Sequence, residues 1–513
     1  MAGASRDRLF FATVSYLLAP NLIFLAGWLS PRWGIPAATI ALVCLADIWR
    51  RARTDVPPAA PRQWAFVAVF ALALTVLAGI GGVNVQVTDY LKHDLVFHDL
   101  AVHPWPVVYR HGGAGGSMLC YYIAYYLPPG LAGKLLGVSW IAPASLAWGL
   151  TGVTLTFAWI ARLGRPHSRT VLVAFTLVDG FAWLPGLYPF ARRLLGIAGE
   201  TGGEWWTSAN FAERFATFGT PPMHLLFESI PTELLWVPQH AIVAWLATAC
   251  VLRVLLEGGS PRHLGLVLGS TLLWSPFVTV GLVPLAIAAL RGNARGAFTW
   301  PGVMGGLALT GPVAPYILAH ARYQYVGFFP ARLSGAQDWL RYGLFVVLSV
   351  GILAAAVALV RRHFAIPSRS EWVLFLTCSV WLVATTLVFM GYYNDWVMRV
   401  SMPALMVFRL VVARLAVELW RKGGMLAPRL AFAAFVLLSA ERPLKVYVLA
   451  PFGKVGQQTF HATITEVARE VPTLVQLPGS SAFDYSDQYL GTRQSWFGRH
   501  LLRRHATAEE PPP

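Results

Sequence analysis

Apolar segments of about 20 residues recur along the whole chain, and this recurrence restricts its fold more than any other feature. An α-helix needs a run of that length to cross the hydrocarbon core of a bilayer, since each residue rises about 1.5 Å. Hydrophobic residues make up 56% of the 513 positions and charged residues 12%, whereas soluble domains carry roughly 25% charged residues. The sequence therefore predicts an all-α polytopic membrane protein, a bundle of about 11–13 transmembrane helices.

The predicted bundle occupies residues 1–440 and is followed by a short polar tail at 441–513, whose end from Glu509 reads as disordered. We expect the long segment 117–161 to cross once, with its tyrosine-rich start at the membrane interface. Segment 264–290 is interrupted at Trp274-Ser275-Pro276-Phe277 and should form a broken hairpin, because proline removes a helical hydrogen bond. The candidate spans are 9–29, 35–48, 64–83, 117–161, 169–189, 237–256, 264–290, 298–319, 341–360, 371–391, 397–419 and 427–440.

Basic residues decide the predicted orientation. Arginine and lysine cluster in short loops between spans, as at 50–62, 253–263 and 361–369, which is typical of cytoplasmic loops that face anionic lipid. The net charge of +16 is thereby explained by topology, and nucleic acid is not expected as a partner. With the N-terminus inside, the loops 84–117 and 190–236 and the tail lie on the outer face. Membrane lipid surrounds the bundle.

The first outer loop, 84–117, is rich in acids and histidines. Each of three aspartates precedes a histidine by four positions, which places the two on one face of a helix. A carboxylate there can hold the imidazole and raise its basicity. Since the five-residue period turns each successive pair by about 140°, the three pairs cannot all face one site. The alternative is a solvated amphipathic helix that such pairs stabilise. The pairs are Asp89 with His93, Asp94 with His98, and Asp99 with His103.

Asp89 is the best candidate for a general base. It lies just beyond the apolar run 64–83, where a carboxylate can meet a lipid-borne headgroup and deprotonate an acceptor hydroxyl. Lys92 and His93 can offset the charge of a phosphate. Ionisable groups beside a span are costly to keep, so they point to function. The glycine-rich stretch 112–116 lacks the GK[ST] end of a phosphate-binding loop and is expected to be a hinge.

Two further outer positions carry candidate substrate-binding residues. Gln239 and His240 open the span 237–256 and can hydrogen-bond a sugar or a phosphate, unless they only cap the helix that starts after Pro238. Glu233, with Glu228 nearby, can bind an acceptor or a cation, or can belong to the solvated surface.

The third candidate position is a polar break between two spans, formed by Asn394, Asp395 and Arg399. Arg399 falls in the first turn of the next span, where a buried guanidinium needs an anionic partner. That partner is either Asp395 or the phosphate of a ligand. We predict that all three residues bind substrate. The chain has no G-x-S-x-G, HExxH or Walker motif, so a serine hydrolase, a zincin or an ATP-driven pump has no support.

Several of these stretches, taken together, resemble the GT-C superfamily of integral-membrane glycosyltransferases over most of the spanning region. They are Asp89-Tyr-Leu-Lys-His93, Trp105-Pro106, Tyr121–Pro128, Trp236–His240 and Asn394–Pro403. The resemblance implies that a sugar moves from a polyprenyl-phosphate donor to a glycan, lipid or protein acceptor at the outer face of a bacterial inner (plasma) membrane. It implies that Asp89 acts as base or metal ligand beside Asp94, with a divalent cation, Mg²⁺ or Mn²⁺, as a cofactor.

The chain departs from the usual GT-C pattern in two respects. Its acidic loop follows the third predicted span rather than the first, and Thr88-Asp89-Tyr90 stands where many members have paired acids. A polytopic transporter or a flippase for lipid-linked sugars is an alternative that predicts ionisable residues within spans, of which Asp179 is one. An O-antigen ligase or polymerase would place its key residues in one large, late outer loop. A non-catalytic assembly subunit would not need Asp89.

Overall fold

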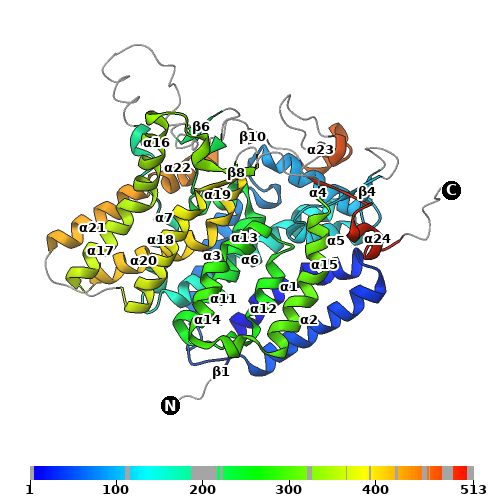
Figure 1. Ribbon diagram of the computed structural model, residues 1–513, viewed down its shortest axis with the longest axis horizontal. Coiled ribbons are helices and arrows are strands. Elements are labelled where there is room, and N and C mark those ends of the chain that lie inside the picture. Colours follow the sequence, from blue (N-terminus) through cyan, green and yellow to red (C-terminus); the bar gives the residue numbers. More distant parts are fainter. Residues whose placement is uncertain are drawn as a thin grey trace, which may run out of the picture.

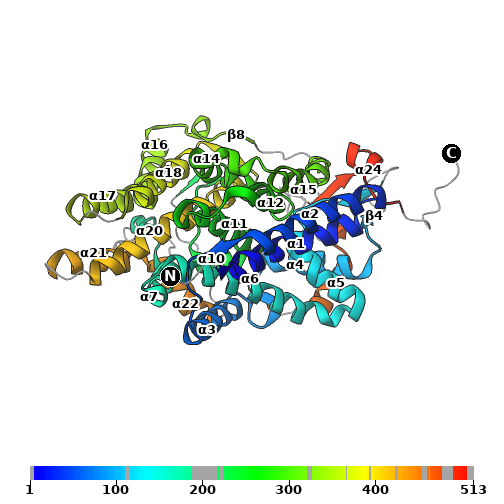
Figure 2. The same ribbon diagram turned by 90° about the horizontal axis from the view of Figure 1, so that it is seen from below.

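The computed structural model describes residues 5–109, 116–186, 216–219, 223–320, 326–364, 367–391, 394–421, 426–452, 459–460, 463–476 and 489–504. These residues form a predominantly helical assembly, as the sequence predicts (Figure 1). Helices α17, α18, α20 and α21 gather toward one end of its long axis and α24 lies at the other (Figures 1 and 2).

The helices are α1 (Arg8–Gly27), α2 (Pro31–Arg51), α3 (Pro61–Leu77), α4 (Asp89–Val102), α5 (Leu127–Leu136), α6 (Ile141–Leu163), α7 (Ser168–Leu177), α10 (Ile230–Trp236), α11 (Pro238–Glu257), α12 (Leu264–Thr271), α13 (Pro276–Gly281), α14 (Val283–Ala297), α15 (Trp300–Leu318), α16 (Ala336–Val346), α17 (Ile352–Phe364), α18 (Arg369–Thr385), α19 (Asp395–Val400), α20 (Met402–Arg421), α21 (Leu426–Ser439), α22 (Glu441–Leu449), α23 (Ile464–Glu470) and α24 (Trp496–His500). The strands are β1 (Ser5–Arg6), β2 (Arg53–Thr54), β3 (Gln86–Val87), β4 (Val108–Tyr109), β5 (Ser117–Leu119), β6 (Thr217–Phe218), β7 (Met223–His224), β8 (Val326–Phe328), β9 (Val388–Met390), β10 (Thr459–Phe460) and β11 (Leu490–Thr492).

Among the described residues, five helices are long and apolar enough to cross a membrane. Three of them are α1, α2 and α11. The fourth runs over Val138–Leu163 and contains α6, and the fifth runs over Ala336–Phe364, where α16 and α17 join through a π-helical turn. Of the other predicted spans, 64–83 and 169–189 fold as the shorter helices α3 and α7, whereas α15 and α20 have 19 and 20 residues but are less apolar or more charged. A bundle of about a dozen full crossings therefore stays a prediction.

The segments 264–290 and 117–161 are both interrupted. α12 ends at Thr271 and α13 begins at Pro276, so the segment 264–290 is broken at the Trp-Ser-Pro-Phe stretch. The Ser275 side chain caps α13 by accepting a hydrogen bond from the Val278 amide. The segment 117–161 contains a strand, the short α5 and a single helix of spanning length.

The loops predicted to share a side of the membrane lie together. β1 pairs with β2, and Arg162 at the end of α6 forms ion pairs with Asp7 and Glu257, so the chain start and the loops at 50–62, 162–169 and 253–263 meet at one end of the helices. In Figure 1 this end lies at the bottom, and α4, α19, α23, β8 and β10 lie along the top. This grouping agrees with the predicted sidedness. Which side faces the cytoplasm stays a prediction.

Two segments of the tail pack onto the end of the molecule that contains α4. β10 pairs with β3, and β11 pairs with β5, which in turn pairs with β4. The Asp99 carboxylate accepts hydrogen bonds from the Thr473 hydroxyl and the Leu474 amide, which ties the tail to α4. The predicted hinge at 112–116 (except Gly116), most of the second outer loop 190–236, and the stretch from Glu509 lie outside the described residues.

Glycines let α12 and α15 approach closely. A Cβ atom placed on Gly265 would lie 2.1 Å from the Gly302 carbonyl oxygen, and one on Gly269 would lie 3.0 Å from the Gly306 carbonyl oxygen. Small residues spaced four apart are typical of helices that pack backbone to backbone in membranes. This contact fixes α12, and with it the break that presents Ser275.

Candidate active site

α4 carries the acidic and histidine residues of the first outer loop, and it is a buried helix. Of its 14 residues, nine are buried, including His93, Asp94 and Asp99. It packs against α5 and α23, and the Tyr90 hydroxyl donates to the Ala78 carbonyl at the end of α3. The alternative of a solvated amphipathic helix is therefore wrong, because most of the surface of α4 contacts protein.

Asp89 and Lys92 form an ion pair in the first turn of α4, with 3.0 Å between the Asp89 Oδ1 and Lys92 Nζ atoms. The Asp89 side chain keeps 31% of its surface exposed, although its neighbour His93 is buried. Burial among protein atoms acts to raise the pKa of Asp89, but the charges of Lys92 and Arg399 act against it, and the pKa lies below its usual value. Asp89 is thus an ionised, accessible carboxylate at neutral pH.

His93 is held by Tyr126, whose hydroxyl lies 2.5 Å from the His93 Nδ1 atom. Burial lowers the pKa of His93 to about 4, against the attraction of the Asp89 carboxylate. The imidazole is therefore uncharged at neutral pH. It also lies beside the backbone of Trp236, which brings α4 next to the start of α11.

His240, in the first turn of α11, is oriented by the break between α12 and α13. Its Nδ1 atom lies 2.8 Å from the Ser275 hydroxyl, and its ring lies 4.6 Å from that of Tyr122. Since the Ser275 oxygen accepts from the Val278 amide, it can donate its own proton to His240. The Nε2 atom then carries the ring proton, and no described residue accepts a hydrogen bond from it. A buried donor without an acceptor suits a ligand.

Arg399, in the short helix α19, lies next to the same group. It pairs with Asp395 at 2.6 Å, and its guanidinium lies 6.0 Å from the Tyr122 ring and 5.7 Å from the Phe277 ring. Its Nε atom is buried without a hydrogen-bond partner in the described part of the chain. Tyr122 and Phe277 also line an apolar cavity of about 180 Å³, so the cation lies beside an apolar cavity.

These residues from three separate helices, α4, α11 and α19, form one site. The positive charge of Arg399 acts on Asp89 and on His93. His240 also lies within the range of electrostatic interaction with Arg399 and His93. We call the group of Asp89, Lys92, His93, His240 and Arg399 the outer site. The structure thus brings together five residues that the sequence singles out one by one.

Other predicted site residues do not join the outer site. Asp94 points to a different side of α4, where burial raises its pKa well above the usual value and one of its carboxylate oxygens has no partner in the described residues. Asn394 is fully buried in a left-handed turn, and its amide donates to the His224 carbonyl and accepts from the Met390 amide. Gln239 is buried beside His240, and its side-chain oxygen has no partner among the described residues.

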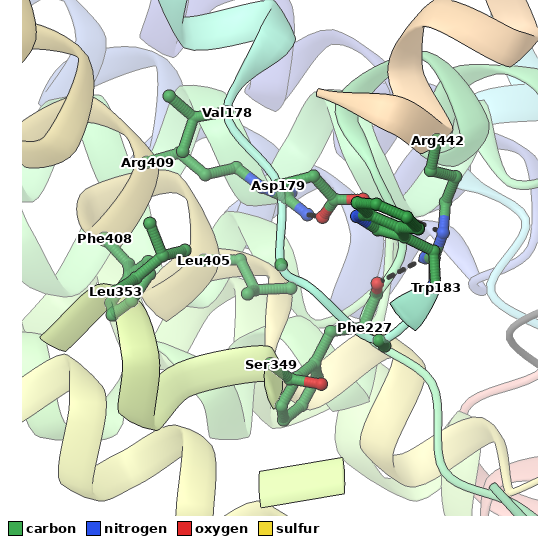
Figure 3. Close-up of a pocket in the computed structure, with 12 residues that line it drawn as sticks. Val178, Asp179, Trp183, Phe227, Ser349, Leu353, Leu405, Phe408, Arg409 and Arg442 are labelled. Atoms are coloured by element: carbon green, nitrogen blue, oxygen red, sulfur yellow. Dashed lines mark hydrogen bonds and ion pairs between the residues drawn. The ribbon is translucent and has the colours of Figure 1, made fainter. Parts of the chain in front are cut away.

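Glu233 belongs to a second, separate cluster, in which α10 meets α20. Arg409 of α20 pairs with Glu233 at 3.0 Å. It also pairs with Asp179 at 3.1 Å (Figure 3). The Trp245 indole donates a hydrogen bond to the other oxygen of Glu233. Glu233 is fully buried, so the prediction that it lies on a solvated surface is wrong.

Arg442 and Glu228 complete this second cluster, which we call the Arg409 cluster. Arg442 lies 3.7 Å from Asp179 and 3.6 Å from Glu228. Burial raises the pKa of Glu233 to about 8, although Arg409 acts to lower it. Three acids thus face two arginines, and the raised pKa of Glu233 favours its protonated form at neutral pH. The adjoining cavity measures only about 20 Å³, enough for about one water molecule, so the cluster joins helices and leaves no room for a sugar.

Tyr489 and Ser275 lie beside the outer site, and the sequence does not identify them as site residues. The Tyr489 ring lies 4.2 Å from the Tyr121 ring, close enough to Lys92 and Asp89 for their charges to act on its hydroxyl. Its only sequence signal is an aromatic residue in a polar tail. Ser275 had a stronger signal, because it directly precedes the proline that breaks segment 264–290.

The described residues contain no group of three or more His, Cys, Asp or Glu side chains that could hold a metal ion, and the expected Mg²⁺ or Mn²⁺ stays a prediction. Comparison of the chain with protein-family models, with curated proteins and with solved structures gave no match. The geometry of the outer site is therefore the basis for assigning a function to the protein.

The buried, uncharged state of His93 predicts a pH effect on stability. Its pKa is 6.5 in the unfolded chain and about 4 in the folded one, so the unfolded chain binds the proton first as the pH falls. Above pH 6.5 both states are uncharged at His93, and the free energy of unfolding keeps its full value. Between pH 6.5 and pH 4 the free energy of unfolding falls by about 3 kcal/mol, at about 1.4 kcal/mol for each pH unit. Thermal unfolding of His93→Gln should show a smaller loss between these pH values than the wild type.

The matched control is His500→Gln, since His500 is exposed on α24. It should unfold with the pH dependence of the wild type. A wild-type pH dependence in His93→Gln would contradict the assignment of a buried neutral imidazole.

Proposed function

We propose that the protein is a membrane glycosyltransferase of GT-C type, with the outer site as its active site. The donor is a sugar linked to polyprenyl phosphate, and the acceptor is a glycan, a lipid or a protein at the outer face of a bacterial inner membrane. The observation that carries this proposal is that Arg399 lies against two aromatic rings that line an apolar cavity, and close enough to Asp89 for its charge to act on that carboxylate.

A lipid phosphate matches that position in chemistry. Its isoprenoid chain is apolar and suits the cavity between Tyr122 and Phe277, and its phosphate is anionic and suits the buried guanidinium of Arg399. The free Nε–H of Arg399 and the Nε2–H of His240 supply hydrogen bonds to phosphate oxygens. Such donors stabilise the charge that develops on the phosphate as the bond to the sugar breaks.

Asp89 is suited to the role of general base. Its carboxylate is ionised and accessible, and Lys92 holds it in place. In the proposed reaction Asp89 accepts the proton of the acceptor hydroxyl, the acceptor oxygen forms a bond to the anomeric carbon, and the phosphate oxygen leaves with the electron pair of the broken bond. The proton stays on Asp89 until water takes it, and His93 supports the pair as an uncharged neighbour.

The proposal is tested by binding and by turnover. Purified full-length protein in lipid nanodiscs is offered farnesyl phosphate, and binding is measured for the wild type and for Arg399→Gln. We expect the variant to lose about tenfold or more in affinity, since a buried charge-assisted contact contributes about 1.5–3 kcal/mol. Release of free polyprenyl phosphate from a panel of polyprenyl-phosphate sugars then measures turnover.

Arg414→Gln is the matched control for binding, because Arg414 lies on α20 in an ion pair with Glu371, away from the outer site. It should bind farnesyl phosphate as the wild type does. Equal binding by Arg399→Gln, or no release from any donor by the wild type, would refute the proposal.

The Arg409 cluster favours a second candidate, a polytopic transporter or a flippase for lipid-linked sugars. Buried ionisable groups inside a helical bundle are typical of transport proteins, and Asp179, Glu233 and Arg409 are such groups. The same reconstituted protein distinguishes the two candidates. A flippase moves a fluorescent lipid-linked sugar across the bilayer without releasing polyprenyl phosphate, whereas a transferase releases it.

A further inference from the structure

The end of the molecule opposite the outer site contains a large cavity with basic walls. Its volume is about 650 Å³, more than three times that of the apolar cavity beside Arg399. Six arginines line it, against two acidic residues, Asp55 and Glu257. The arginines are Arg51, Arg53, Arg162, Arg165, Arg253 and Arg262.

The charges of two of these arginines are neutralised by ion pairs with acidic residues. Arg162 donates to Asp7 at 2.7 Å and pairs with Glu257, and Arg253 donates to Asp7 at 2.7 Å. These four residues lie in α6, α11 and the segment before α1, so this network fixes the shape of the cavity. The side chains of Arg162 and Arg253 are both nearly buried.

Two other arginines are less fully neutralised. Among the described residues neither Arg53 nor Arg165 has an ion-pair partner, and the polar contact of the Arg165 guanidinium is to the Pro57 carbonyl. The burial of Arg165 lowers its pKa, and the charge of the nearby Arg162 lowers it further. A cavity of fixed shape with unpaired guanidinium groups at its wall attracts an anion with several oxygen acceptors.

The surroundings of the cavity indicate where that anion resides. Trp49, in the last turn of α2, and Trp64, in the first turn of α3, are both exposed, and these two helices flank the loop that carries Arg53. Exposed tryptophans near helix ends are typical of the membrane–water interface, and exposed Leu42 and Val69 continue the apolar surface away from it. The cavity therefore opens at the depth of lipid headgroups.

We propose that this cavity is a binding site for a phosphate-bearing anion, held by Arg53 and Arg165. The phosphate belongs either to the headgroup of an anionic phospholipid or to a soluble phosphate compound, and the exposed tryptophans favour the lipid. The site is separate from the outer site, and it does not depend on the function proposed for that site. Basic pockets between membrane helices on the cytoplasmic side bind such headgroups.

The test uses the full chain in nanodiscs of neutral phosphatidylcholine. Phosphatidylglycerol is added and its binding is followed by native mass spectrometry and by the midpoint of thermal unfolding. We expect the double variant Arg53→Gln/Arg165→Gln to bind phosphatidylglycerol about tenfold more weakly than the wild type. The matched control is Arg291→Gln/Arg295→Gln, which removes the same charge from exposed positions on α14, beside the same end of the molecule.

A second arm identifies the source of the phosphate. Pyrophosphate is added to protein in neutral nanodiscs, and the same midpoint is measured. A shift by phosphatidylglycerol alone, lost only in the double variant, supports a lipid headgroup. A shift by pyrophosphate, also lost only in the double variant, supports a soluble phosphate compound. Absence of both shifts in the wild type, or equal losses in the double variant and its control, would overturn the proposal in favour of an unspecific basic surface.

Discussion

The Asp89→Asn variant is expected to release polyprenyl phosphate about 10²- to 10⁴-fold more slowly than the wild type, the usual contribution of a positioned general base. Asparagine keeps the size of the side chain but cannot accept a proton. It also leaves Lys92 without the carboxylate that it pairs with at 3.0 Å. The measurement is steady-state release from a lipid-linked sugar donor, with farnesyl phosphate binding as a separate readout that should change much less.

The Asp94→Asn variant tests whether the position of an aspartate on α4, and not the repeated Asp–His spacing alone, decides which one acts as the base. Asp94 is buried on another side of the helix, and its raised pKa makes it a neutral acid that asparagine can mimic. We expect this variant to keep most of its turnover. If Asp89→Asn keeps wild-type turnover and Asp94→Asn loses it, the base has been assigned to the wrong residue.

The Arg409→Met variant is expected to lose about 3–5 kcal/mol of unfolding free energy, because it leaves buried acids without their cation. Arg409 pairs with Glu233 and Asp179 and also donates to the Glu228 backbone carbonyl, so one side chain joins α20 to α10 and to the end of α7. Methionine fills much of the same volume and removes the charge. Denaturant unfolding in mild detergent at pH 7 gives the difference from the wild type.

The control is the same substitution at Arg414, one turn further along α20. Arg414 is partly exposed and pairs with Glu371 and Glu418, so its loss should cost about 1 kcal/mol or less. Equal losses for the two variants would mean that the Arg409 cluster contributes no more than a surface ion pair.

The sequence predicts the helical character of the chain better than the number of membrane crossings. Apolar runs identify the segments, and the proline after Ser275 correctly predicts a break between α12 and α13. Runs such as 64–83 and 169–189, however, form α3 and α7, which end at Leu77 and Leu177. Composition measures how apolar a segment is, but the point at which a helix ends depends on packing against the rest of the chain.

Most of the outer site could be found from the sequence because its residues are ionisable groups beside apolar runs. Asp89, His240 and Arg399 each stand out for that reason. Their meeting in space, and the hydrogen bond from Ser275 that orients His240, could not be predicted, since no local pattern relates residues in different spans. Arg409 was missed for the opposite reason, because a single arginine within an apolar run does not reveal that Glu233 and Asp179 lie beside it.

The pairing of β11 with β5 affects how the protein is made. Cys120, directly after β5, donates its amide to the Tyr489 carbonyl, and Tyr489 packs on Tyr121. During synthesis the ribosome therefore delivers α4 and its acidic residues to the membrane hundreds of residues before the strand that covers them. A nascent chain stalled before β11 can insert its helices but has no finished outer site, so this assembly step has to follow membrane insertion.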